Sequence, residues 1–118
     1  MTETYHLFQK GRRQLADGMP AQATVSLEKA KRREPGKASI REALGIAYFR
    51  LQRYVEAEAE FRALLEISPA DDYGHYALGR ALDKLGRTGE AQTEYKLARA
   101  LRPTSRRYQA RVRGLESQ

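Results

Sequence analysis

The chain has 118 residues, enough for one domain, with 41% hydrophobic residues and a net charge of +7. It has no cysteine, which excludes disulfides and thiolate metal sites. No apolar run approaches the roughly 20 residues that span a bilayer, and the start, MTETYHLFQKGRR, lacks the order of a secretory signal. We therefore expect a cytoplasmic protein with no membrane insertion.

The charge is unevenly distributed along the chain. Residues 1–37 carry eight basic and four acidic side chains, whereas residues 38–71 carry four and six. Residues 72–103 carry six and four, and residues 104–118 carry four and one. Both ends are therefore basic and the middle is mildly acidic. Such a pattern can steer an acidic partner, and it can also simply keep a protein soluble.

Apolar residues recur every three or four positions along successive segments, which predicts amphipathic helices. In chain order the expected helices are 4–17, 20–33, 38–51, 54–67, 72–85, 88–101 and 105–116. Gly18 and Gly86 fall between the helices of a pair, where a left-handed residue commonly ends a helix. Ser39 followed by Glu42 has the spacing of a capping box, and Thr104 is the expected cap of the last helix.

One interval, 34 residues, recurs through the whole chain. It separates the members of five sets: Gly11, Gly45 and Gly79; Ala23, Ala57 and Ala91; Leu27, Phe61 and Tyr95; Ala30, Leu64 and Ala98; Pro35, Pro69 and Pro103. A period of this size predicts a stacked array of helix pairs. We expect one domain made of repeats 4–37, 38–71 and 72–105, followed by a capping helix at 105–116.

The glycine inside each first helix needs a reason, because glycine costs about 1 kcal/mol relative to alanine there. We expect Gly45 and Ala57 to mark a close contact between paired helices, where another backbone approaches, while Phe61 fills a wider gap. A larger side chain should then be worse than a smaller one, so Gly45→Leu should destabilise the fold more than Gly45→Ala.

The order L-G-x-x-Y, A-x-x-x-F, P at this period resembles the tetratricopeptide repeat. The second repeat carries the order in full with Leu44, Gly45, Tyr48, Ala57, Phe61 and Pro69. The first departs from it, with Gln14 at the tyrosine position. The family's early aromatic residue is replaced by Leu7, Arg41 and His75. The resemblance implies an all-α, right-handed solenoid of three helix-turn-helix units with a C-terminal solvating helix, seven helices in all.

The resemblance also implies a site. In the family, the first helices line a concave groove that holds a peptide or a helix of a partner protein. The matching positions here are Tyr5, Phe8, Gln9, Arg12, Glu42, Ile46, Phe49, Tyr73, Tyr76, Arg80, Lys84, Arg107 and Arg111. Aromatic residues and arginine are common interface anchors, and arginine can hold a carboxylate with two hydrogen bonds. An acidic or C-terminal segment is therefore a natural ligand, although each aromatic residue could instead belong to the core between repeats and each arginine could be a solvated charge.

One known ligand of the family can be excluded by inspection. Repeats that bind the acidic C-terminal tails of heat-shock chaperones use a clamp of Lys, Asn, Asn, Lys and Arg. The corresponding positions here are Phe8, Arg12, Ala43, Tyr73 and Ala77. Only Arg12 keeps a donor of similar charge, so we do not expect those tails to bind.

Three classes of function remain open, with a bacterial-type stand-alone adaptor first. The second is a structural subunit of a homo-oligomer or larger complex joined through its end surfaces. The third and least favoured is nucleic-acid binding through the basic run at 29–37 and the end helix. The acidic residues Glu56, Glu58, Glu60 and Glu66 are expected mostly on the convex side, facing solvent or a subunit, with Glu58 attracting Arg62. His6 and His75 form no pair at metal-ligand spacing, and no nucleophile lies beside a base, so we expect neither catalysis, nor a metal, nor a cofactor.

Overall fold

The computed structural model describes residues 2–116, and the side chains of residues 3–112. Within this range the chain forms seven helices and no strand: α1 (Thr2–Ala16), α2 (Pro20–Arg33), α3 (Ala38–Arg50), α4 (Tyr54–Ile67), α5 (Asp72–Lys84), α6 (Thr88–Leu101) and α7 (Arg106–Glu116). Each helix begins and ends within two residues of the bounds predicted from the hydrophobic period.

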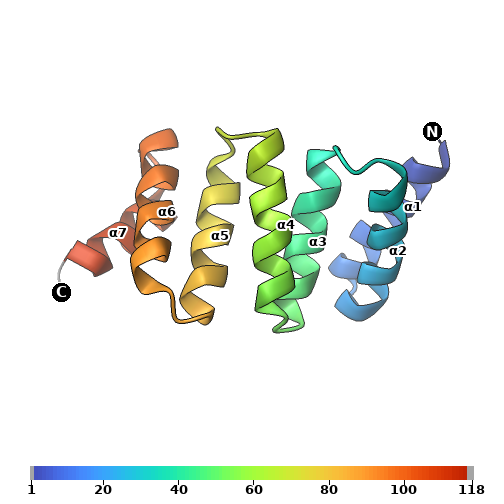
Figure 1. The fold of residues 1–118 in the computed structure, drawn as a ribbon, viewed down its shortest axis with the longest axis horizontal. Helices are drawn as coiled ribbons and strands as arrows, with labels where there is room; N and C mark the ends of the chain where they lie inside the picture. Colours follow the sequence, from blue (N-terminus) through green and yellow to red (C-terminus); the bar gives the residue numbers. More distant parts are fainter. Residues whose placement is uncertain (1, 117–118) are drawn as a thin grey trace.

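The helix pairs follow one another along the molecule, with α2, α4 and α6 in a layer in front of the first helices, and the two ends of the chain lie at opposite ends (Figure 1). The principal dimensions are 47 × 25 × 21 Å. α1 packs on α2, α3 on α4 and α5 on α6, each pair contacts the next pair, and α7 packs on α6. The fold is the predicted all-α solenoid of helix pairs closed by an end helix.

The repeated glycines make room for a side chain of the paired helix. A methyl group at Gly11 would lie 2.5 Å from Cγ of Leu27, and one at Gly79 would lie 2.6 Å from Cε1 of Tyr95. At Gly45 the same space is filled by the ring of Phe61, which is 1% exposed. The prediction of a close contact is therefore right, but its nature differs from the expectation, because a side chain rather than a backbone enters the space.

The turns inside the three helix pairs share one left-handed residue. Gly18 and Gly86 have φ values of 74° and 79°, and Gln52 has a φ of 61° at the equivalent position. Left-handed backbone is costly for a residue with a Cβ, so the same turn geometry is imposed at Gln52 by the packing of the helices on either side. The predicted glycine turns are thus correct, and the middle repeat makes the same turn without glycine.

Two of the predicted helix caps are wrong. The Ser39–Glu42 capping box does not form, because α3 begins at Ala38 with Lys37, not Ser39, at the cap position, and Lys37 makes no side-chain cap. At the last helix Ser105, not Thr104, provides the cap, with its Oγ accepting a hydrogen bond from the Tyr108 backbone N–H at 3.3 Å. Spacing alone cannot distinguish adjacent hydroxyl residues when the start of a helix shifts by one position.

In α3, α5 and α7, one side chain makes a polar contact with the turn that precedes the helix. Arg41 Nε donates to the Pro35 carbonyl at 3.0 Å, and Gln109 Nε2 donates to the Pro103 carbonyl at 2.5 Å. His75 Nε2 lies 2.8 Å from the carbonyl of Pro69. These positions are 34 residues apart, so the early aromatic position of the family here holds side chains that hydrogen-bond the turn.

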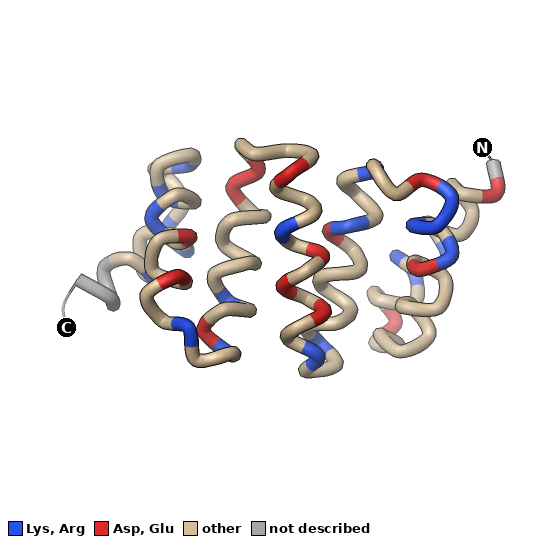
Figure 2. Tube along the Cα trace, in the orientation of Figure 1, with Lys and Arg blue, Asp and Glu red and all other residues tan. Residues whose placement is uncertain are grey.

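Glu60 corrects the expectation that the acidic residues of α4 face solvent. Its side chain is buried, and it accepts hydrogen bonds from Lys31 Nζ at 2.9 Å and from Arg41 Nη1 at 3.1 Å. It therefore joins α2, α3 and α4. The predicted attraction between Glu58 and Arg62 is confirmed by an ion pair of 2.8 Å. Figure 2 shows the acidic positions along α4 and basic positions on the helices near both ends.

Candidate functional site

Three hollows follow one another along the first helices. The first hollow, of about 420 Å³, lies between α1 and α3 and is lined by Phe8, Arg12, Leu15, Ala16, Ser39, Glu42, Ala43, Ile46 and Arg50. The middle hollow, of about 400 Å³, lies between α3 and α5 and is lined by Ile46, Phe49, Arg50, Gln52, Tyr54, Phe61, Tyr73, Ala77, Arg80 and Lys84. The last hollow, of about 290 Å³, is lined by Arg80, Asp83, Lys84, Tyr95 and Arg111.

Neighbouring hollows share residues. Ile46 and Arg50 line both the first and the middle hollow, and Arg80 and Lys84 line both the middle and the last. The hollows are therefore one continuous surface feature, which we call the groove. It runs from α1 past α3 and α5 to α7.

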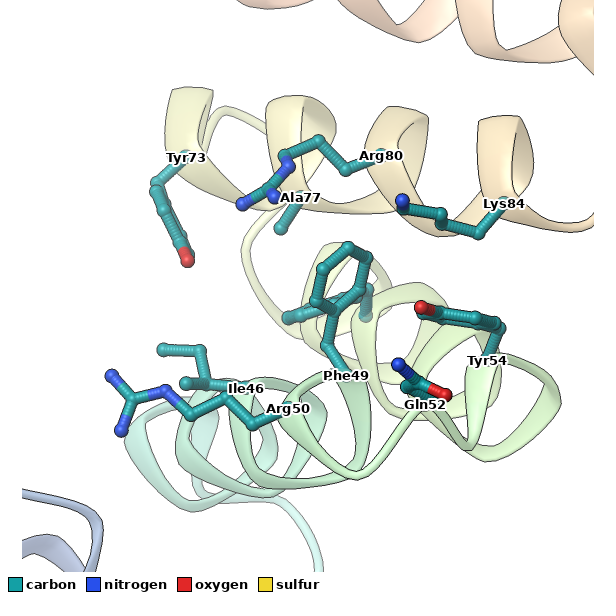
Figure 3. A pocket seen from close by; sticks show the side chains of 10 residues that line it. Ile46, Phe49, Arg50, Gln52, Tyr54, Tyr73, Ala77, Arg80 and Lys84 are labelled. Carbon is teal, nitrogen blue, oxygen red and sulfur yellow. The ribbon is translucent and has the colours of Figure 1, made fainter. Parts of the chain in front are cut away.

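Helical periodicity places the lining residues of the middle hollow. Tyr73, Ala77, Arg80 and Lys84 step by three or four positions along α5, which puts them on one face. Ile46 and the adjacent Phe49 and Arg50 face them from α3. In Figure 3 the two rows lie on opposite sides of the hollow, and the guanidinium of Arg80 extends toward Phe49.

The arginines of the groove stack on aromatic rings. The guanidinium carbon of Arg80 lies 4.6 Å from the ring centroid of Phe49, and that of Arg12 lies 5.6 Å from Phe8. Toward α7, Arg111 lies 5.5 Å from the centroid of Tyr95. A cation above a ring face is held by the ring quadrupole, while the N–H groups in the guanidinium plane stay available to a ligand.

These cations have no acidic partner within the described residues. Arg12, Arg80, Lys84, Arg107 and Arg111 make no hydrogen bond or ion pair with a carboxylate there. By contrast, Arg53, Arg62 and Arg87 all pair with glutamates. The cations that face the groove are thus not neutralised by an ion pair within the described residues.

Arg50 differs from the other cations of the groove. Its Nη1 donates to the Leu15 carbonyl at 2.9 Å. The hydrogen bond ties the end of α3 to the end of α1 and fixes the Arg50 side chain at the boundary between the first and middle hollows.

Glu42 is the acidic residue of the first hollow, and it is half-buried. No hydrogen bond or ion pair to its carboxylate is found among the described residues. Burial raises its pKa, as does the nearby charge of Asp71, and Arg12 offsets these effects only partly. Burial and the charge of Glu42 also raise the pKa of Tyr73. The site therefore holds an ionisable carboxyl group in surroundings that disfavour its charge.

The structure brings together nine of the residues predicted from the sequence. Phe8, Arg12, Glu42, Ile46, Phe49, Tyr73, Arg80 and Lys84 line the first and middle hollows, and Arg111 lines the last. Tyr5 is 59% exposed and lines a further hollow of about 230 Å³, which shares Phe8 with the first hollow and is otherwise lined by Thr4, Glu34, Lys37 and Ile40. Gln9 is half-buried and is not among the residues that line these hollows.

Tyr76 lies in the core rather than on the surface of the groove. It is 7% exposed, and its ring centroid lies 5.3 Å from that of Tyr108 and 6.1 Å from that of Tyr95. Arg107 does not line a hollow either, and its guanidinium lies 5.3 Å from the Tyr76 ring centroid. Tyr76 is therefore a core residue, and cations near the last hollow lie over its ring. This placement matches the alternative given above, in which the aromatic residues pack between repeats.

Several lining residues were not predicted from the sequence, among them Arg50 and Tyr54. Arg50 lies four positions after Ile46, so the helical period could have identified it. Tyr54 belongs to α4, and its ring centroid lies 5.2 Å from that of Phe49 in an edge-on arrangement. Counting positions on first helices cannot find Tyr54, because the tight turn through Gln52 brings it back to the groove.

The remaining observations concern membrane-spanning helices and metal sites. In the part of the chain that the structure describes, no helix is both long enough and apolar enough to cross a membrane. Among the same residues, no group of three or more His, Asp or Glu side chains is arranged to hold a metal ion.

Comparison with protein families places two matches on the chain. A model described as tetratricopeptide repeat matches residues 8–72, and a second model with the same description matches residues 52–113. Each match covers more than half of the chain. No curated protein matches the sequence.

Similar solved structures have the same fold at low sequence identity. The TPR domain of Arabidopsis OM64 has a TM-score of 0.94 at 18% identity, with 99% of this chain and 97% of that chain covered. The first TPR of Spaghetti (RPAP3), bound to the HSP90 peptide SRMEEVD, has a TM-score of 0.92 at 20% identity, with 98% and 92% covered. MamA has a TM-score of 0.88 at 22% identity, with 90% of this chain and 62% of that chain covered. At these identities the likeness shows the fold alone.

Proposed function

This chain belongs to the tetratricopeptide repeat family, and we propose that it is a protein-interaction adaptor that binds a segment of a partner protein in the groove. The observation that carries the proposal is the continuity of the three hollows. A single groove lined in turn by apolar side chains and unpaired cations suits an extended chain better than a compact small molecule.

The composition of the middle hollow supports the proposal. Phe49, Tyr54 and Tyr73 present aromatic surface there, and Arg80 lies over the Phe49 ring. Aromatic residues and arginine carry much of the binding energy at protein interfaces, because they bury a large area with few rotatable bonds. Phe49 and Tyr73 pack against the core, which restricts their side chains before binding, so less side-chain entropy is lost.

A relative with the same fold offers a comparison. The first TPR of Spaghetti (RPAP3) was solved with the peptide SRMEEVD. In the present chain the clamp positions Phe8, Ala43, Tyr73 and Ala77 line the first and middle hollows without the amide and ammonium groups of the clamp. We infer that this groove selects a different sequence from that of the chaperone tails.

A display library of random peptides panned against the immobilised protein tests the function. An enriched peptide, synthesised with blocked ends and a fluorophore, should bind the protein, and Phe49→Ala and Tyr73→Ala should each weaken binding at least tenfold. Val55→Ala is the matched control, because Val55 is 66% exposed on α4 and does not line the groove. The control should change the affinity less than twofold.

Thermal melts followed by circular dichroism establish that each variant is folded at the assay temperature. The proposal is contradicted if no enriched peptide loses affinity with the folded Phe49 and Tyr73 variants, or if Val55→Ala weakens binding as much as they do.

A further inference from the structure

The charges differ between the hollows of the groove. Among the described residues, the middle hollow is lined by Arg50, Arg80 and Lys84 and by no acidic residue. The first hollow contains Glu42 beside Arg12 and Arg50. A segment lying along the groove would therefore meet the Glu42 carboxylate near one end and a run of cations from the middle onward.

The cations extend over more than one helix. Arg80 and Lys84 belong to α5, whereas Arg107 and Arg111 belong to α7. Asp83 lies among them, but its carboxylate accepts a hydrogen bond from the Tyr95 hydroxyl at 2.6 Å. One carboxylate pairs with one guanidinium through two parallel hydrogen bonds. A set of cations spread this widely is therefore matched by several acidic side chains in succession, and not by a single terminal carboxylate.

The stacked geometry keeps these cations ready for a ligand. Arg80 lies over Phe49 at 4.6 Å, and Arg111 lies over Tyr95 at 5.5 Å. Stacking restricts the long side chains before any ligand arrives, so that less conformational entropy is lost on binding. The described residues supply no carboxylate that would have to be displaced first.

Within the described part of the chain, the carboxylate of Glu42 lacks a cationic partner. It is half-buried in the first hollow, and no cation of the described residues is within ion-pair distance of it. Arg12, whose charge partly offsets the effect of burial on Glu42, lies over Phe8. A basic side chain of a ligand would provide the partner that a half-buried carboxylate lacks.

We propose that the groove recognises an extended protein segment with ordered charges, in which a basic side chain pairs with Glu42, an apolar side chain enters the middle hollow, and a run of acidic side chains pairs with Arg80, Lys84 and Arg111. This inference rests on the proposed binding function and specifies the chemistry of its partner. Nucleic acid does not fit the same groove, because its phosphates would meet the Glu42 carboxylate.

Double-mutant cycles with the blocked peptide from the display library test the order of charges. Glu42→Gln is combined with replacement of the peptide's basic residue by norleucine, and Arg80→Gln with replacement of its acidic residues by glutamine. Each matched pair should show a coupling of at least about fivefold in Kd, which corresponds to about 1 kcal/mol. The crossed pairs, such as Glu42→Gln with the glutamine peptide, should couple less than twofold.

The outcomes separate the two proposals. Some peptides could depend on Phe49 and Tyr73 yet carry no acidic run, or show no coupling in the matched mutant pairs. Either result overturns the order of charges and leaves the binding function intact. Displacement of the peptide by a single-stranded oligonucleotide at physiological salt overturns it too, as does displacement by a second copy of the chain seen as a dimer in light scattering. If no peptide depends on Phe49 or Tyr73, the binding function fails and the inference fails with it.

Discussion

Gly45→Ala should destabilise the protein, although alanine is the better helix former. Gly45 lies inside α3, and the ring of Phe61 occupies the space where a Cβ would project. Three ring carbons lie closer to that position than real Cβ contacts allow. The ring is 1% exposed, so it has no solvent to move into.

The size of the effect follows from two opposing contributions. Alanine gains about 1 kcal/mol of helix propensity over glycine, while an extra carbon forced into a packed core costs about 1–3 kcal/mol. We expect the packing cost to prevail, with a net loss of up to about 2 kcal/mol. For a domain of this size such a loss lowers the thermal midpoint by up to about 8 °C.

Urea unfolding followed by circular dichroism measures the loss, with Gly89→Ala as the control. Gly89 lies in α6, and a methyl group there would meet no heavy atom within 4 Å. This variant should therefore keep or raise the midpoint. Gly45→Ala combined with Phe61→Leu should recover at least about 1 kcal/mol relative to the sum of the single changes. A stabilising Gly45→Ala, or additivity with Phe61→Leu, would refute the packing argument.

Three further predictions concern charged positions. Glu42→Gln should raise the thermal midpoint at pH 7, because a carboxyl group whose pKa is raised in the folded state destabilises the fold when it is ionised. The gain should vanish as the pH falls to the unfolded pKa of the carboxyl group, about 4.5. Calorimetry from pH 4 to 8 should show the two midpoints converging. His75→Arg should raise stability at pH 8 by about 1 kcal/mol, because a guanidinium donates to the carboxylate and the carbonyl together, as Arg41 does in the preceding repeat. Glu60→Gln should lower the free energy of unfolding, measured with urea, by about 1–2 kcal/mol. This is less than the loss on breaking a fully buried ion pair, because Lys31 and Arg41 keep part of their contact with water.

Each of these predictions has a contrary outcome. A difference between Glu42→Gln and the parent protein that persists at pH 4 would show that charge is not the cause. A lower midpoint for His75→Arg at pH 8 would show that arginine does not fit the contact made by Arg41. An unchanged stability for Glu60→Gln would mean that the ion pairs between α2, α3 and α4 contribute nothing net.

The helices could be predicted because their causes are local. Hydrophobic period, turn glycines and the repeated prolines act within a few residues, and the 34-residue interval supplied three independent readings of each position. The groove positions of α3 and α5 were implied by the resemblance to the tetratricopeptide repeat. Arg50 was within reach of the helical period and was overlooked.

What sequence reasoning missed depends on contacts between repeats. Glu60 is buried because Lys31 and Arg41 contact it from other helices. The helical period of α4 alone does not show these contacts. Tyr76 is core because α7 covers it with Tyr108. Tyr54 reaches the groove only through the geometry of the turn at Gln52. In each case a partner distant in sequence decides the exposure of the side chain.

The central claim is that the groove along the first helices holds a partner segment. Backbone amide NMR shifts, recorded while the peptide selected from the display library is titrated into the protein, test it most directly. The account predicts that the perturbed signals map to Glu42, Ile46, Phe49, Tyr73 and Arg80 on α3 and α5. Perturbations gathered instead on the exposed positions of α2, α4 and α6, with the groove signals unmoved, would contradict it.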